Sequence, residues 1–152
     1  MDTLRSVSHL QRELGDKLFS ALINSDNTGK VREFCESLRA LPTEITLGGH
    51  TYELLSVLQD GEHRVTGDIV VERAAEMKAN TGREDARQLY RNIKDIPKEL
   101  RGRVCIAFLD WRSESDSREV YCYRWVDGRW IHEEHDLEAD WFPSTRVLRR
   151  KS

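Results

Sequence analysis

The chain has 152 residues, of which 38% are hydrophobic and 34% are charged, and its net charge at pH 7 is −3. A chain of this length can bury one sizeable core without disulfides or metals to hold it together. The slightly acidic balance excludes a general affinity for nucleic acid or anionic membranes, so any basic site must be local. No run approaches the ~20 apolar residues of a membrane-spanning helix, and we expect no membrane association.

Two amphipathic helices are predicted at the N-terminus. Leucine and valine recur every three or four residues from 4 to 22, which places them on one face of a helix of about five turns. A turn cluster follows at 24–29. A second apolar stripe over 31–41 ends before Pro42, because the residue before a proline disfavours helical conformation. The short polar joint favours an antiparallel pair.

A β-hairpin is predicted over 44–54. Ile45 and Leu47 alternate with polar residues, Gly48-Gly49 follows, and Tyr52 and Leu54 resume the alternation. A two-residue Gly-Gly loop suits the positive-φ turns that connect hairpin strands. In that register Ile45 faces Tyr52, so apolar meets apolar.

Two further helices are predicted between 66 and 97. The first carries an apolar stripe over 70–77. The second has a capping box at its start, in which Thr81 is followed three residues later by Glu84. Its apolar stripe comprises Ala86, Leu89, Tyr90 and Ile93. One helical turn over 98–102 then leads into a strand.

A β-meander is predicted in the last third. Residues 104–109 are continuously apolar, as in a central strand buried on both faces. A charged loop over 112–118 leads to a hairpin whose strands, 120–126 and 129–131, flank Asp127-Gly128, a dipeptide typical of two-residue turns. This turn pairs Trp125 with Trp130 and Tyr123 with His132. Residues 145–149 are predicted to form a final edge strand.

These elements predict an α+β fold in which amphipathic helices pack on an antiparallel sheet. In chain order it has an N-terminal helix pair, a β-hairpin, two helices and a C-terminal β-meander. We expect a single domain over 1–152, with the helical pair over 1–41 and a mixed α+β core over 43–151. Two short helices are not stable alone, which argues against a separate N-terminal domain.

Aromatic side chains gather from residue 111 onward. Tyr121, Tyr123, Trp125 and Trp130 share one face of the predicted hairpin. Such a cross-strand ladder usually packs against helices. If this face is open instead, it forms a stacking platform for a base, a sugar ring or a partner protein. The candidate binding residues in this region are Trp111, Tyr123, Trp125, Trp130 and His132.

A one-sided basic stripe is the second candidate binding feature. Arg83, Arg87 and Arg91, called here the arginine stripe, are spaced four residues apart on one predicted helix. Like charges at this spacing disfavour an isolated helix by roughly a few tenths of a kcal/mol per pair, which invites an anionic partner. Neighbouring carboxylates can offset that repulsion, so a solvated helix face is the simpler interpretation. The basic cluster at 146–151 is likewise interpreted as a solvated tail.

Motifs for catalysis or metal binding give little support to an enzyme. His132 and His135 flank two glutamates, but they lie three apart directly after a predicted strand and so point to opposite faces. Asp110 follows a buried strand, where an aspartate more often caps a turn than acts as a general acid or base. The sequence contains no phosphate loop, dinucleotide fingerprint or nucleophile elbow. We therefore predict no metal, no cofactor and no identifiable catalytic residue.

The cysteines point to a reducing compartment. Cys35, Cys105 and Cys122 are odd in number and far apart, which is typical of buried apolar thiols that stay reduced and at most weakly reactive. The N-terminus lacks the basic start and apolar run of a signal peptide. The expected location is the cytoplasm.

Five short motifs stand out in the later part of the chain, at 43–49 (TEITLGG), 71–74 (VERA), 95–97 (DIP), 110–112 (DWR) and 146–151 (RVLRRK). Through them, residues 42–151 resemble a family of small bacterial proteins of unknown function. The resemblance implies a bacterial cytoplasmic protein and supplies no catalytic residue. The N-terminal helices lie outside it.

The leading hypothesis is a small protein-interaction or regulatory module that binds a protein partner or a second copy of itself. The alternative is a nucleic-acid-binding accessory protein that uses the arginine stripe and exposed aromatics. An enzyme with an unrecognised site is the third. Salt dependence separates the first two, because phosphate binding weakens steeply with salt. A deep pocket with paired titratable groups would favour the third.

Overall fold

A six-stranded sheet forms the centre of the molecule. The computed structural model describes residues 28–151, apart from the side chains of 28–31, 34 and 35. The strand order is β1-β2-β8-β4-β5-β6, and a separate small sheet pairs β3 with β7. All strand pairs are antiparallel except β4 with β8. The strands are β1 (Glu44–Leu47), β2 (His50–Ser56), β3 (Val65–Thr66), β4 (Cys105–Arg112), β5 (Glu119–Val126), β6 (Arg129–Asp136), β7 (Asp140–Trp141) and β8 (Thr145–Arg150).

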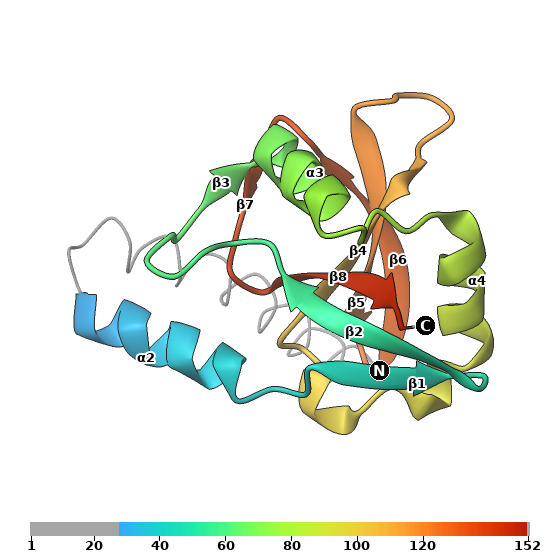
Figure 1. Cartoon of the computed structure of the whole chain (residues 1–152), viewed down its shortest axis with the longest axis horizontal. Coiled ribbons are helices and arrows are strands. Elements are labelled where there is room, and N and C mark those ends of the chain that lie inside the picture. The colour runs from blue at the N-terminus through green and yellow to red at the C-terminus, as the bar shows by residue number, and fades with distance from the viewer. Residues whose placement is uncertain (1–27, 152) are drawn as a thin grey trace.

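Helices cover both faces of this sheet (Figure 1). The α3 face is the side covered by α3 (Gly67–Glu76) and the β3–β7 pair. The α4 face is the side covered by α4 (Arg83–Arg91) and by two 3-10 turns, η1 (Ile93–Asp95) and η2 (Lys98–Leu100). At one end of the molecule, α2 (Thr28–Arg39) reaches the α4 face through Leu38. The mixed α+β class, with a mostly antiparallel sheet, is thereby confirmed.

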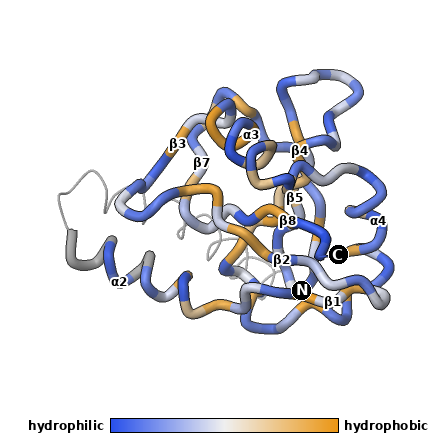
Figure 2. Tube along the Cα trace, viewed as in Figure 1, coloured by the Kyte–Doolittle hydropathy of each residue, from blue (hydrophilic) through white to orange (hydrophobic). Residues whose placement is uncertain are grey.

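Strand β4 is shared by the two cores. Ile106 and Phe108 point into the core under α4, while Ala107 and Leu109 point into the core under α3. All four are fully buried. This is the central strand, buried on both faces, that the continuous apolar run predicts. Figure 2 shows that α4, at the right of the view, is largely hydrophilic, in contrast to the apolar strand β4.

The final strand is not an edge strand, which corrects that prediction. β8 lies between β2 and β4, pairing Leu148 with Leu54 and Val147 with Ala107. The prediction was wrong because the arginines of this segment are typical of a solvated tail, whereas in the structure Arg146 and Arg149 bind backbone carbonyls and a carboxylate. Arg146 is only 7% exposed and donates to three backbone carbonyls, including that of Leu38. Further along the same segment, Arg149 pairs with Glu53 and Lys151 with Glu44.

Both predicted hairpins are confirmed with their registers. Ile45 pairs with Tyr52 across the Gly48-Gly49 turn, and Trp125 pairs with Trp130 across Asp127-Gly128. All four turn residues have positive φ, from 53° at Asp127 to 84° at Gly49. That backbone geometry matches the twist of the strands on either side, so the turn residues set the pairing.

The helix predictions are confirmed in outline and wrong in detail. Within the described residues α2 runs from Thr28 to Arg39, over the segment where the second apolar stripe predicts a helix. The capping box before α4 does not form: Gly82 is the N-cap residue, and the buried Thr81 hydroxyl has no hydrogen-bond partner. Tyr90, expected in the apolar stripe, is 65% exposed. The helix predicted over 4–22 lies outside the described residues.

Candidate interaction surface

The aromatic residues of the β5–β6 hairpin lie on the α4 face, as the sequence predicts. Tyr121, Tyr123 and Trp125 alternate along β5, and Tyr123 stands opposite His132 on β6. Tyr123 and Trp130 are buried, but Tyr121 and Trp125 are half-buried. The ladder is therefore partly core and partly surface.

A β-bulge brings Trp111 onto the same face. The pairing of β4 with β5 shifts register between Phe108 and Arg112. A bulge of this kind re-aims side chains, and here the Trp111 ring stacks on Tyr121 with centroids 4.2 Å apart. The bulge is held in place by the Asp110 N–H, which donates to the Thr81 carbonyl 2.9 Å away, and by the Asn80 amide, which donates to the Asp110 carboxylate. Asp110 is an exposed residue of β4, and these two hydrogen bonds tie it to the loop that precedes α4.

His132 completes an open patch, called here the aromatic strip and made of Trp111, Tyr121, Tyr123 and His132. The imidazole is exposed, and its centroid lies 5.5 Å from that of Trp111 and 5.7 Å from that of Tyr121. Tyr123, buried at 4% exposure, forms the floor beneath. Three of the predicted candidates therefore meet here.

The remaining two aromatic candidates lie further along the hairpin. Trp125 and Trp130 meet edge to face, with centroids 5.8 Å apart. The guanidinium of Arg101, just after η2, sits 4.3 Å from the centre of the Trp125 ring. Trp130 is therefore buried and the half-buried Trp125 ring already carries a guanidinium, whereas no cation of the described chain is recorded over Trp111 or Tyr121.

Two carboxyl groups border the aromatic strip at the end of the hairpin. The Tyr121 hydroxyl donates to Glu134 over 3.1 Å, and the Ser113 hydroxyl reaches the same oxygen. A hydrogen bond with Glu134, together with repulsion from neighbouring carboxylates, raises the pKa of Glu119 to about 7. The hydrogen bonds from Glu119 and Tyr121 lower the pKa of Glu134. The pair carries at least one negative charge at neutral pH.

The arginine stripe lies on α4 beside the strip. Arg83, Arg87 and Arg91 are all exposed, and Arg87 forms an ion pair with Glu84 over 2.6 Å. On the other side of the helix, the Tyr52 hydroxyl donates to Asp85 and ties α4 to β2. Tyr90, on the same helix, lies near the strip. Burial, and then the nearby Tyr90 hydroxyl, raise the pKa of Tyr123.

The two histidines of the 132–135 segment do not meet. Both lie within β6, which continues to Asp136, so the loop expected after residue 131 is strand instead. His132 contacts the aromatic strip, while His135 lies on the α3 face, 4.2 Å from the Trp141 ring. The predicted opposite orientation is confirmed. Within residues 28–151, no three His, Cys, Asp or Glu side chains gather in a way that could hold a metal ion.

Sequence reasoning missed several members of this surface. The sequence places Tyr121 on the correct face without singling it out as a binding residue. It treats Glu134 only as one of the two glutamates between the histidines, and it draws no attention to Glu119. The signal was present: extending the Asp127-Gly128 register two pairs beyond Tyr123–His132 places Glu134 opposite Tyr121, and Glu119 then lies two residues further along the same face of β5. Tyr90 carried no such signal, since its spacing is that of a core residue.

No helix in the described part of the chain is long and apolar enough to cross a membrane. Comparison with known proteins gives no relative: no family model, curated protein or solved structure matches this chain.

Proposed function

We propose that this chain is a protein-interaction module whose aromatic strip receives an arginine or lysine side chain from a partner protein. The observation that carries the proposal is the combination of open aromatic rings with a carboxyl pair at their edge. Trp111 and Tyr121 are half-buried and stack on each other, and Glu134 accepts a hydrogen bond from the Tyr121 hydroxyl.

The rings of the strip and the carboxyl pair beside it both favour the binding of a cation. Tryptophan and tyrosine are enriched among the residues that dominate protein interfaces. A guanidinium over an indole gains roughly 0.5–2 kcal/mol, more as it is desolvated. Glu119 and Glu134 supply the opposite charge, and Arg101 over Trp125 shows the same pairing within the chain itself. Arginine fits better than lysine because its planar group stacks on rings and pairs with carboxylates at once.

The proposal can be tested with peptides that carry one central arginine. The controls replace it by citrulline, which has the same shape without charge, or by lysine. NMR shifts of the Trp111 and Tyr121 resonances report occupancy of the strip. We expect binding in the order arginine, lysine, citrulline. Equal binding of arginine and citrulline peptides would contradict the proposal.

Two neighbouring glutamates on β6 provide a matched pair of variants. At about pH 8, where Glu119 is largely ionised with or without Glu134, Glu134→Gln removes a charge from beside the strip and is expected to weaken arginine binding roughly three- to tenfold. Glu133→Gln removes the same charge, but Glu133 pairs with Arg124 on the other face of the sheet. It should leave the affinity unchanged. Thermal unfolding of both variants checks that neither has lost its fold.

A second candidate function is nucleic-acid binding along α4. The supporting observation is that Tyr90, 65% exposed, stands beside the exposed arginine stripe. An aromatic ring flanked by cations is a common arrangement for binding single strands. The carboxyl pair at the nearby strip opposes phosphate, so we rank this function second.

A further inference from the structure

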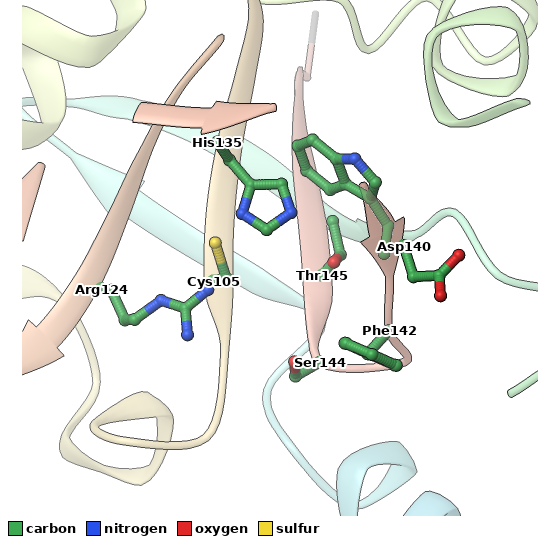
Figure 3. A pocket seen from close by; sticks show the side chains of 8 residues that line it. Cys105, Arg124, His135, Asp140, Phe142, Ser144 and Thr145 are labelled. Atoms are coloured by element: carbon green, nitrogen blue, oxygen red, sulfur yellow. The ribbon is translucent and has the colours of Figure 1, made fainter. Parts of the chain in front are cut away.

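A small cavity on the α3 face brings a cysteine together with an arginine and a histidine. Its volume is about 40 Å³, and its lining includes Cys105 of β4, Arg124 of β5, His135 of β6 and Thr145 of β8. Cys105 and Arg124 stand directly opposite each other in the β4–β5 pairing. Figure 3 shows the Cys105 sulfur between the Arg124 guanidinium and the His135 ring.

The cavity reaches the surface but admits only small molecules. Asp140 also lines it and is exposed, whereas Cys105 is only 4% exposed. A volume of this size holds one or two waters. A peroxide of similar size can therefore enter, while a bulky thiol reagent cannot.

A second thiol lies beside the first. Cys122 is on β5, two residues before Arg124 and on the same face, and both cysteines are free and buried. The hydrogen bond from the Cys122 thiol, and then the Arg124 guanidinium, lower the pKa of Cys105 against the opposing effects of its burial and of Glu133, which pairs with Arg124. The same hydrogen bond and burial raise the pKa of Cys122 well above its usual value. The two thiols are thus unequal: Cys105 has the larger thiolate fraction, whereas Cys122 keeps its proton and donates it to Cys105 in the hydrogen bond.

We propose that Cys105 is a site of oxidation by hydrogen peroxide and that Cys122 then forms a disulfide with it. The inference is independent of the proposed function, because the cavity and the aromatic strip lie on opposite faces of the sheet. It also departs from the expectation that all three thiols are only weakly reactive.

The chemistry balances in two steps. The Cys105 thiolate, having released its proton to solvent, attacks one peroxide oxygen; an S–O bond forms and the O–O bond breaks. The leaving hydroxide takes up a proton and becomes water. The sulfur of Cys122 then attacks that of Cys105, so an S–S bond forms, the S–O bond breaks, and the departing hydroxide leaves with the Cys122 proton as a second water. Two electrons pass from the two thiols to one peroxide.

The test uses the full chain with Cys35→Ser as background, so that only Cys105 and Cys122 remain. The folded protein is treated with peroxide, quenched with catalase, unfolded, alkylated and weighed by mass spectrometry. We expect loss of two hydrogens and of both free thiols. Cys122→Ser should instead stop at one added oxygen on Cys105, and Cys105→Ser should leave Cys122 reduced.

Arg124 provides a second, quantitative test. Arg124→Gln should slow oxidation roughly three- to tenfold by reducing the thiolate fraction, while Arg124→Lys keeps the charge and most of the rate. Bulky aromatic disulfides should not label the folded protein. The proposal is overturned if Cys105 stays reduced at doses that oxidise free cysteine. It is equally overturned if Cys122 oxidises without Cys105, or if oxidation tracks unfolding in urea.

Discussion

The two faces of the sheet are built on different principles. The core of the α3 face is built largely from valine, alanine and cysteine, with Trp141 of β7 as its one large ring among the described residues. At the start of α3, Gly67 lies against the backbone of Leu137, just after β6, and its N–H donates to the Leu137 carbonyl. The α4 face carries large rings instead, and α4 buries only Ala86 and Leu89 against them.

This difference explains why the open surface lies where it does. A nine-residue helix with two buried residues cannot cover the rings of β4, β5 and β6 as well as those of β2. Tyr123 and Trp130 are buried, whereas Trp111 and Tyr121 remain half-buried and His132 is exposed. An aromatic residue on a strand is therefore buried only where a helix or turn covers that part of the sheet.

The largest expected effect tests whether the two faces form one cooperative unit. Phe108 and Leu109 are neighbours on β4, both fully buried, and point to opposite faces. Phe108→Ala should cost about 3–5 kcal/mol and Leu109→Ala about 2–5 kcal/mol of unfolding free energy. Urea denaturation should show one transition for each variant. Selective loss of one face, with the other still folded, would contradict the shared core.

The next prediction compares the starts of the two covering helices. A Cβ at Gly67 would lie 2.3 Å from the Leu137 carbonyl oxygen, so Gly67→Ala should cost about 1–3 kcal/mol through overpacking. Gly82 has extended backbone, and a Cβ there would meet Asp110 at an ordinary 3.4 Å. Gly82→Ala should therefore cost less than about 1 kcal/mol. Equal thermal midpoints for the two variants would show that α3 is not packed as closely as inferred.

A smaller effect concerns the carboxyl pair of the α4 face. Glu119 has a pKa of about 7 in the folded protein against 4.5 ordinarily, so between these values the folded state binds more protons than the unfolded state. Stability from this group is present below pH 4.5 and is lost as pH rises through about 7. The thermal midpoint should fall slightly over that window, and Glu119→Gln should remove this fall. Glu114→Gln, an exposed carboxylate of the adjoining loop, serves as the control and should preserve it.

The smallest expected effect is that of replacing the arginine stripe. Changing Arg83, Arg87 and Arg91 together to glutamine should alter stability by less than about 1 kcal/mol, because all three are exposed and glutamine keeps helix propensity. We expect neither the parent nor the variant to bind nucleic acid near about 150 mM salt. Micromolar binding by the parent that is lost in the variant would promote the second candidate function over the first.

Local sequence determined the hairpins and the facing of their side chains. The Gly48-Gly49 and Asp127-Gly128 turns set the strand registers, and the period of two along each strand then assigns every residue to a face. For the same reason the sequence places Tyr123 opposite His132, whereas Trp111 joins them through the bulge in β4. The position of β4 in the centre of the sheet was equally predictable. Residues 104–109 are all apolar, so side chains on both faces of the strand must be buried.

Only the tertiary structure decided which elements lie side by side and what covers each face. β8 became a central strand because Glu53, Glu44 and backbone carbonyls, distant in sequence, satisfy its basic residues. Tyr90 has core spacing but is 65% exposed, because Ala86, Leu89 and Ile93 are the residues of this segment that pack against the core. Cys105, Arg124 and His135 come from three different strands, and no local period connects them. Sequence periodicity determines how a residue is oriented relative to its neighbours, whereas the proximity of distant segments depends on long-range packing that one sequence does not display.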